Sequence, residues 1–440
     1  MSTSPLIRHS CHLSIFAALS LTTALYSAEY EAKPADAAFA QFQALKAPAT
    51  GPLILKANDR LAICGDSITE QKKYGCIIET YLTVCVPELN VTVRQYGWSG
   101  ETAEGFLNRM NNDCLRFKPT IATTCYGMND YKYRPYDEAN ATWYRDRYSS
   151  VVKRFKEAGA RVILGSPGCV GKVASWVKSA SGTLEQHNLH LCALRNIDVE
   201  IAAKEEVGFA DVFWPMFTAS TVARQKYGEG YNIAGGDGVH PQWAGQLVMA
   251  YAYLKAMGLD GNLGTITVNL AAKKASASTG HTVDAFANNE VVVTSRRYPF
   301  CAAGALNSDD SIRSGMTLVP FNQELNRLNL IVTGGAAANY TVTWGTESRT
   351  YTAAQLAKGI NLADDFQINP FSDAFAKVNK AVLAKQTFET EQIKKIFHGA
   401  EGNQDMEAAV KRTEAIREPL AAAIKTALVP VTHRICITEK

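Results

Sequence analysis

The stretch that decides the fold is Leu61-Ala62-Ile63-Cys64-Gly65-Asp66-Ser67-Ile68-Thr69-Glu70, an apolar run of strand length that stops at a Gly-Asp-Ser turn and continues as a helix-like segment. Ligands of open α/β sheets gather at the carboxyl ends of the strands, so Ser67 lies where chemistry is usually done. A serine in this position can equally be the N-cap of the helix that follows. The stretch alone leaves both roles open.

Strand-like and helix-like stretches alternate on either side of this turn, between residues 61 and 258. Such an alternation, with connections of this length, indicates parallel strands with helices on both faces. The right-handed crossover rule then favours a doubly wound α/β/α sandwich. The expected strands are 61–65, 91–96, 120–126, 161–166 and 208–213, and the expected helices are 71–86, 101–116, 140–158, 183–206 and 242–258.

The composition is that of an ordinary globular protein. With 440 residues, the chain is long enough for one large domain and a smaller one. Hydrophobic residues make up 47% and charged residues 20%, and the net charge is only +3. No run of Lys and Arg with interleaved aromatic residues occurs, so we expect no nucleic-acid partner. The sequence does not show whether the chain has a protein partner.

Past residue 260 the pattern changes. Short alternating apolar runs, such as 290–294, 328–332 and 340–345, are separated by Gly, Asn and Asp and predict a small antiparallel β unit. From residue 353 the pattern becomes helical, with Pro419 expected to kink or split the last helix. We therefore divide the chain into a main domain (29–260), a β unit (261–352) and a helical C-terminal tail (353–440).

The first 28 residues have the layout of a signal peptide. Basic residues near the start precede an apolar run, and small residues end it at Ser27 and Ala28. The run is shorter than the ~20 apolar residues of a membrane span, so we expect no permanent anchor. We expect an exported protein, periplasmic or extracellular. Of the ten cysteines, nine would remain after removal of Cys11; none has the paired spacing of a zinc site, and no disulfide pairing can be assigned.

Four short blocks carry groups that could do chemistry, and each follows an expected strand or precedes the last expected helix. They are Gly65-Asp66-Ser67, Gly97-Trp98-Ser99-Gly100-Glu101-Thr102, Gly127-Met128-Asn129-Asp130 and Asp237-Gly238-Val239-His240-Pro241. Serine hydrolysis of an ester needs a nucleophile, a base, a group that orients the base, and donors for the oxyanion. The four blocks supply one set of these groups.

We expect Ser67 to be the nucleophile, His240 its base and Asp237 the carboxylate that orients the imidazole. The oxyanion donors would be the backbone N–H groups of Ser67 and Gly97 and the side-chain amide of Asn129. Each residue also has a plain structural reading. Taken singly, His240 can cap the following helix, Asp237 and Asn129 can form turns, and Gly97 can be a turn glycine.

Together the four blocks, in this order, resemble the SGNH hydrolases, also called the GDSL esterase family, over roughly residues 58–260. The resemblance implies a flavodoxin-like α/β/α sandwich, the catalytic roles given above, and hydrolysis of acyl esters with no metal and no cofactor. Two positions depart from the pattern. Ile68 stands where Leu is common, and Gln95 stands where the family often has Asn two residues before the glycine. Neither residue bears a reacting atom.

Three aromatic residues are candidates for binding substrate, since each adjoins one of the blocks: Trp98, Tyr131 and Trp243. Packing in the core is the alternative for each. We interpret Asp66 and Asp130 as structural carboxylates that hold their loops. A further hypothesis is that Pro320-Phe321-Asn322, in the C-terminal extension, narrows access to the site.

These observations favour an exported serine esterase that removes short acyl groups, O-acetyl groups above all, from carbohydrate. Its substrate would be a small-molecule or polysaccharide ester. One alternative is a lipid or aryl-ester hydrolase that uses the same triad. The other is a glycan-binding protein that keeps the fold without catalysis.

Overall fold

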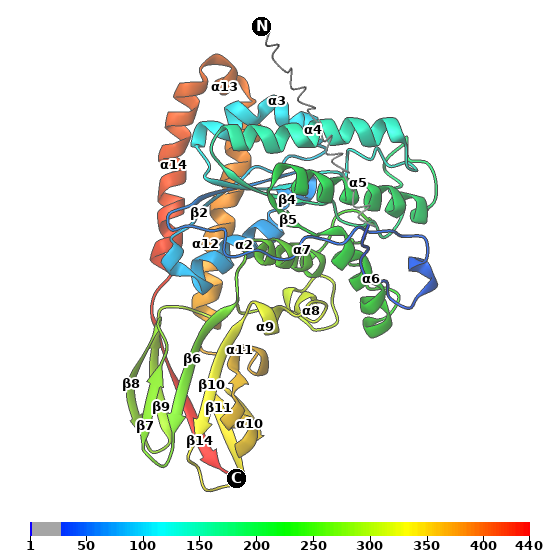
Figure 1. The fold of residues 1–440 in the computed structure, drawn as a ribbon. Helices are drawn as coiled ribbons and strands as arrows, with labels where there is room; N and C mark the ends of the chain where they lie inside the picture. The colour runs from blue at the N-terminus through cyan, green and yellow to red at the C-terminus, as the bar shows by residue number, and fades with distance from the viewer. Residues whose placement is uncertain (2–27) are drawn as a thin grey trace.

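The computed structural model describes Met1 and residues 28–440. Residues 2–27 of the expected signal peptide, with Cys11, lie outside the described residues. Among residues 28–440, none of the helices combines the length and the apolar character that crossing a membrane requires. An α/β domain, a β unit below it and a helical arm along one side make up the molecule (Figure 1).

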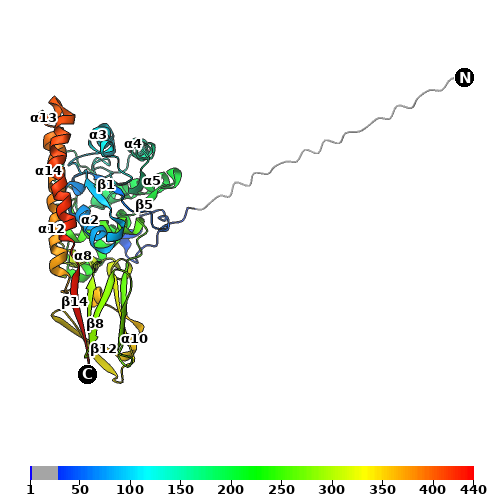
Figure 2. The same cartoon turned by 90° about the vertical axis from the view of Figure 1, so that its left-hand side faces the viewer.

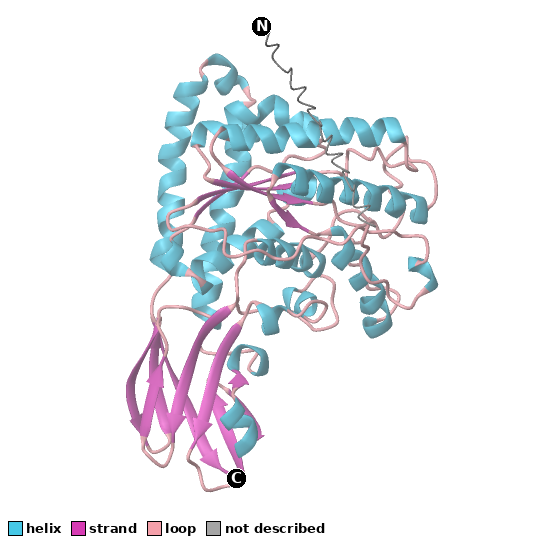
Figure 3. Ribbon diagram, viewed as in Figure 1, coloured by secondary structure: helices cyan, strands magenta, loops and turns pink. Residues whose placement is uncertain are grey.

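The α/β domain is built on a parallel sheet of five strands in the order β2-β1-β3-β4-β5. This is a flavodoxin-like order, so the fold class expected from the sequence is confirmed. The sheet runs through the middle of the domain, between two layers of helices (Figure 3). The strands are β1 (Arg60–Gly65), β2 (Thr92–Gln95), β3 (Ile121–Cys125), β4 (Arg161–Gly165) and β5 (Gly208–Ala210).

Helices α3, α4 and α5 pack side by side on one face of the sheet, and α2 and α7 pack together on the other (Figure 1). Side-chain caps start several of them, such as Thr102 before α3 and Asp137 before α4. The helices are α1 (Ser67–Glu70), α2 (Lys73–Cys85), α3 (Ala103–Asp113), α4 (Glu138–Glu157), α5 (Leu184–Glu205), α6 (Phe213–Tyr227) and α7 (Trp243–Ala256), with 3-10 turns η1 (Ala37–Phe39), η2 (Pro87–Leu89) and η3 (Leu115–Phe117).

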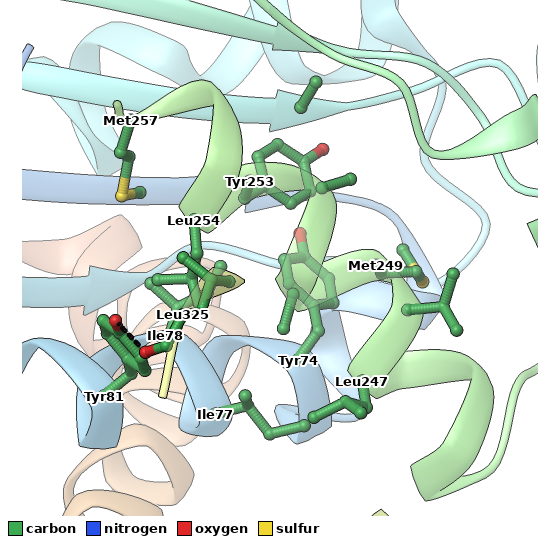
Figure 4. Close-up of a cluster of buried hydrophobic side chains, with 14 of the residues drawn as sticks. Tyr74, Ile77, Ile78, Tyr81, Leu247, Met249, Tyr253, Leu254, Met257 and Leu325 are labelled. Carbon is green, nitrogen blue, oxygen red and sulfur yellow. Dashed lines mark hydrogen bonds between the residues drawn. The ribbon is translucent and has the colours of Figure 1, made fainter. Parts of the chain in front are cut away.

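The core between α2 and α7 positions the turn that carries Ser67. The rings of Tyr74 and Tyr253 stack, with centroids 5.6 Å apart. The Tyr253 hydroxyl donates to the carbonyl of Thr124 (2.8 Å), and the Tyr74 hydroxyl lies 2.8 Å from Oγ1 of Thr69 in α1. Both tyrosines thus tie the helix layer to the carboxyl end of the sheet. Figure 4 shows this cluster, with Tyr74, Ile77, Ile78, Tyr81, Leu247, Met249, Tyr253 and Leu254.

The β unit consists of two sheets, with strand orders β13-β10-β6-β7 and β12-β11-β14-β9-β8. Contrary to the expectation of a purely antiparallel unit, β10 pairs with β6 in parallel. Its strands are β6 (Asn262–Asn269), β7 (Lys274–Ala277), β8 (His281–Ala287), β9 (Glu290–Ser295), β10 (Arg327–Thr333), β11 (Asn339–Trp344), β12 (Glu347–Thr352), β13 (Ile360–Asn361) and β14 (Val431–Glu439), and its helices are α8 (Ile312–Met316), α9 (Phe321–Glu324), α10 (Ala353–Lys358) and α11 (Leu362–Asp365).

The stretch Pro320-Phe321-Asn322 lies at the joint between the β unit and the α/β domain. Phe321 is buried there against Tyr81 and Phe300. The Tyr81 hydroxyl also donates to the carbonyl of Leu325 (2.6 Å), which fastens α2 to this joint. The hypothesis that this stretch narrows access to the site is therefore wrong, because its aromatic side chain packs inside the protein.

The tail expected to be helical from residue 353 is only partly so. It forms the C-terminal arm, defined here as residues 372–427: α12 (Ser372–Glu391), the π-helix η4 (Gln392–Phe397), α13 (Ala400–Gln404) and α14 (Met406–Ala427). The chain then returns as β14, between β11 and β9 of the β unit. The period-two burial of His433, Ile435 and Ile437 explains this strand. Helix α14 is not split at Pro419.

The C-terminal arm runs along one side of the α/β domain (Figure 2), where α12 packs against α2 and the edge strand β2. Buried charges fix it there. Lys385 of α12 is 1% exposed and contacts Glu79 of α2 (2.9 Å) and Glu389 (3.0 Å). Arg417 of α14 donates to the same Glu389 (2.7 Å). The arm therefore covers the sheet edge as a docked part of the protein.

Candidate active site

Ser67 is the first residue of α1, directly after β1. The Asp66 side chain accepts a hydrogen bond from the N–H of Ile68 (2.9 Å) and caps the helix. Asp66 is buried, and this burial raises the pKa of its carboxyl to about 7. At Gly65 a Cβ would lie 2.1 Å from Oγ1 of Thr69, so this turn admits no larger residue. The Gly-Asp-Ser sequence thus builds a tight turn that presents Ser67.

The structure brings Ser67, His240 and Asp237 into one hydrogen-bonded chain. Oγ of Ser67 lies 2.8 Å from Nε2 of His240, and Nδ1 of His240 lies 2.6 Å from Oδ2 of Asp237. Ser67 and His240 are 173 positions apart in the sequence. Such a chain can remove a proton from the serine hydroxyl while the carboxylate holds the imidazole in the required tautomer.

The turn at 237–240 keeps Asp237 ionised and aimed. Its Oδ1 accepts hydrogen bonds from the backbone N–H groups of Val239 and His240, both at 2.9 Å. Partial burial by itself would raise the pKa of Asp237, but these bonds and the one to the His240 ring hold that pKa below its usual value. The carboxylate can therefore stabilise a positive charge on the imidazole.

Asn129 is held in place by hydrogen bonds to both ends of its amide. Its Nδ2 donates to the backbone carbonyl of Glu101 (2.9 Å), and its Oδ1 accepts from the Tyr133 hydroxyl (3.4 Å). An amide nitrogen carries two N–H donors, so one is left for a ligand. The side chain can thus serve as an oxyanion donor.

The N–H of Gly97 is engaged within its own loop, since it donates to the side-chain carbonyl of Gln95. A Cβ at Gly97 would lie 2.2 Å from the backbone nitrogen of Glu70, so this loop packs directly on the helix that begins with Ser67. The loop is adjacent to Ser67 as expected from the sequence. For its N–H to reach an oxyanion, however, the Gln95 side chain would have to turn away.

The loops around the site are held together by Asp130. Its two carboxylate oxygens accept the backbone N–H groups of Ala103 (2.9 Å) and Gly127 (2.8 Å), which join the loop after β3 to the start of α3. Burial raises the pKa of Asp130 to about 6. Both Asp66 and Asp130 therefore hold backbone, as interpreted from the sequence.

A pocket of about 570 Å³ opens over Ser67 and His240. Most of its wall is polar or charged, which suits a hydroxylated or otherwise polar substrate. The residues that line it are Ser67, Glu70, Gln71, Lys72, Ser99, Gly236, Asp237, His240 and Gln242.

The three aromatic residues expected to bind substrate are not among the described residues that line this pocket. Tyr131 is fully buried, and its hydroxyl lies 3.2 Å from Nδ1 of His187, so its expected role as a substrate contact is wrong. Trp98 and Trp243 are half-buried and packed against the core. All three have the packing role that was their alternative.

Trp176 does not line this pocket either, but it lies beside His240. Its indole is 51% exposed, stacks on the ring of His240 (centroids 5.8 Å apart, planes 28° apart) and meets Tyr133 edge-on. It lies in the long connection between β4 and α5. Its position after a strand of the parallel sheet is the only signal that could have singled it out.

The comparison with protein families agrees with this geometry. Residues 63–248 match the model of the GDSL-like lipase/acylhydrolase family, a span that includes every member of the hydrogen-bonded chain. The chain carries a GDSL-like lipase/acylhydrolase domain. The resemblance noted in the sequence is thereby confirmed for residues 63–248, and this match identifies a serine ester hydrolase. No curated protein matches the chain.

Similar solved structures extend the comparison. A gut microbial diltiazem-metabolizing enzyme, BT4096, is 22% identical, with 89% of this chain and 100% of that chain covered and a TM-score of 0.72. The shared fold thus includes most of the region beyond the family match. Two smaller neighbours cover 47% of this chain: the acetylxylan esterase Axe2 from Geobacillus stearothermophilus (21% identity, 96% of that chain, TM-score 0.38) and LAE5, an alpha/beta hydrolase enzyme from the metagenome of Lake Arreo, Spain (21%, 98%, 0.37).

Proposed function

We propose that the protein hydrolyses short acyl esters, O-acetyl esters above all, on carbohydrate, through an acyl-enzyme on Ser67. The observation that carries the proposal is the chain of hydrogen bonds from Ser67 through His240 to Asp237, at 2.8 and 2.6 Å. The polar wall of the pocket supports a hydroxylated substrate over a lipid chain. The half-exposed indole of Trp176 beside His240 offers an apolar face on which a sugar ring can rest.

In the first half of the reaction, Oγ of Ser67 attacks the acyl carbon while Nε2 of His240 takes the hydroxyl proton. The negative charge that develops on the carbonyl oxygen is stabilised by the N–H of Ser67, which has no acceptor inside its helix, and by the free N–H of Asn129. The bond from the acyl carbon to the alcohol oxygen then breaks, and His240 gives its proton to the leaving alcohol.

In the second half, water attacks the acyl carbon of the ester on Ser67 and gives a proton to His240. The bond to Oγ breaks, the proton returns to Ser67, and the carboxylic acid leaves. Asp237 remains ionised throughout, in keeping with its lowered pKa. We also propose that the protein acts outside the cytoplasm, on the strength of the signal-like residues 1–28.

The test compares wild type, Ser67→Ala and the matched control Ser150→Ala, a serine of α4 that bonds only to a backbone carbonyl of its own helix. Each is incubated with p-nitrophenyl esters of increasing chain length and with acetylated polysaccharides, and acetate and alcohol are measured. We expect release by wild type and Ser150→Ala alone, with short chains preferred. Preference for long chains would favour a lipid hydrolase. Binding of polysaccharide without release by any of the three would favour a glycan-binding protein.

A further inference from the structure

We propose that the segment 392–398 of the C-terminal arm positions the two loops that flank the developing oxyanion, with Lys394 and His398 as its positioning residues. This inference rests on the proposed function of Ser67 and Asn129. The segment lies outside residues 63–248, which the family match covers, so the family blocks do not account for it. Two separate chains of contacts connect it to the active site.

The first chain runs from Lys394 to the loop that contains Gly97. Nζ of Lys394 donates to both carboxylate oxygens of Glu70, at 2.9 Å each. Glu70 is the last residue of α1, the one-turn helix that begins with Ser67. Its Oε2 in turn accepts the backbone N–H and the hydroxyl of Ser99 (2.5 and 2.7 Å). Lys394 therefore fixes the carboxylate that fastens the Gly97 loop to the nucleophile helix.

The second chain runs from His398 to Asn129. Nε2 of His398 lies 2.8 Å from Oδ2 of the fully buried Asp113. Nη1 of Arg109 donates to the same oxygen (3.2 Å), and the guanidinium also forms two bonds to the carboxylate of Glu101 (2.5 and 2.7 Å). The backbone carbonyl of Glu101 accepts the N–H that orients Asn129 (2.9 Å). The end of η4 thus braces the amide donor.

Trp98 connects the two chains. Its indole meets the His398 ring edge-on, with centroids 4.9 Å apart, and Nζ of Lys394 lies 5.3 Å from the ring centroid. The guanidinium of Arg109 lies 5.2 Å from the same centroid. Trp98 directly follows Gly97, so the arm holds this loop by an aromatic contact as well as by charge.

The π-helical geometry of η4 is consistent with a functional role. Helix α12 changes at Gln392 to a π-helix that ends at Phe397. Turns of this kind inside helices are frequent at functional sites. The buried pair of Lys385 and Glu79 anchors the arm one helix earlier, so the segment is presented from a rigid support.

The test measures kcat and KM of the full chain with p-nitrophenyl acetate and with an acetylated polysaccharide. For Lys394→Met we expect kcat to fall by roughly 10- to 100-fold with KM nearly unchanged, because a 1 Å misplacement of catalytic groups can cost ~10²-fold. Lys394→Arg should restore most of the rate, since arginine keeps the pairing with Glu70. The matched control is Lys395→Met, whose side chain is 75% exposed, and it should behave as wild type.

A second pair of variants tests the other chain of contacts. His398→Phe removes the contact with Asp113 and should lower kcat as Lys394→Met does, whereas His398→Gln keeps a donor and should lower it less. If Lys394→Met does not melt cooperatively, it has not folded normally, and the kcat of His398→Phe then tests the inference. Wild-type kcat in Lys394→Met and His398→Phe, or a raised KM at unchanged kcat, would overturn the inference while Ser67→Ala still abolishes activity. If wild type hydrolyses no ester, the proposed function itself has failed.

Discussion

The indole of Trp176 lies against the imidazole of His240, with ring centroids 5.8 Å apart and planes inclined by 28°. A tryptophan that is 51% exposed beside the proposed catalytic base offers an apolar face to the alcohol part of an ester. It also covers one face of the imidazole and so limits the directions from which water can approach His240. If Trp176 stacks on the sugar, its removal will affect only sugar substrates. If it shields His240 from water, its removal will affect every substrate.

If Trp176 binds the sugar, Trp176→Ala will raise KM for an acetylated oligosaccharide and leave p-nitrophenyl acetate hydrolysis nearly unchanged. Loss of an aromatic stacking contact worth about 0.5–1.5 kcal/mol corresponds to a roughly 2- to 12-fold rise in KM. Tyr136→Ala is the control, because Tyr136 is similarly exposed (48%) but its ring meets His190 and not His240. Equal losses on both substrates would show that Trp176 acts through His240 instead.

Replacing Asp237 with Asn should separate orientation from binding. The variant keeps an oxygen for the N–H groups of Val239 and His240 but loses the charge that faces Nδ1 of the imidazole. In a Ser-His-Asp triad such a change lowers kcat by about 10⁴-fold, because the wrong tautomer is favoured. We expect a loss of that order in kcat with KM nearly unchanged. A loss of less than about tenfold would mean that His240 is oriented by other groups.

Asn129 and Tyr133 offer a matched pair for the oxyanion donor. Asn129→Ala removes the amide and should lower kcat by about 10²–10³-fold, the usual cost of one oxyanion donor. Tyr133→Phe removes only a long hydrogen bond (3.4 Å) to the oxygen of the same amide, and Asn129 stays fastened to Glu101. That variant should keep most of its rate. Steady-state kinetics on p-nitrophenyl acetate measures kcat of the two variants. Similar losses of kcat in Asn129→Ala and Tyr133→Phe would assign the oxyanion donor to the tyrosine.

Local patterns explain why so much of the α/β domain could be predicted from the sequence. The apolar run at 61–65 and the capping side chains of Asp66, Thr102 and Thr183 define strand ends and helix starts within a few residues. Helix α6 was missed, because Val212 before it provides no side-chain cap and Pro215 lies in its first turn. The expected strand 208–213 accordingly ends early, at Ala210.

What could not be predicted depends on contacts between distant parts of the chain. The sequence of β14 is a short alternating run. Its place in the β unit follows only from its pairing with β9 and β11, from which the C-terminal arm separates it in the sequence. Nothing local distinguishes Lys394 from its neighbour Lys395, although one contacts Glu70 and the other is exposed. Trp176 differs from the other tryptophans in its contact with His240, which only the folded structure shows.

The buried charge of Lys385 predicts how firmly the arm is attached. Lys385→Met leaves Glu79 and Glu389 in the interior without their shared cation. Breaking a buried pair in this way costs about 3–5 kcal/mol. We expect a clear fall in melting temperature and faster proteolysis within residues 372–427. Lys380→Met, an exposed lysine of the same helix, is the control and should melt as wild type does. Equal melting of both variants would contradict the prediction.

The β unit contains a buried polar chain that ends with the last strand. Oγ of Ser295 lies 2.7 Å from Nδ1 of His281 and 3.0 Å from Nε2 of His433, and Nδ1 of His433 accepts the indole N–H of Trp344 (3.0 Å). Nε2 of His281 donates to the carbonyl of Leu263 (2.9 Å). Every donor in this chain finds an acceptor only when both imidazoles are neutral. A proton on Nδ1 of His433 would face the N–H of Trp344.

Burial, and then the neighbouring His281, lower the pKa of His433 from 6.5 to about 3. In the unfolded chain His433 takes up a proton near pH 6.5, but in the folded chain it does so only near pH 3. The unfolded state therefore binds more protons between these values, and the contribution of His433 to stability is complete above pH 6.5 and is lost as the pH falls. Between pH 7 and 4.5 wild type should lose about 2–3 kcal/mol more of its unfolding free energy than His433→Gln, whose side chain does not titrate. Urea unfolding of both proteins at the two pH values measures this difference, and parallel losses would show that His433 titrates alike in both states.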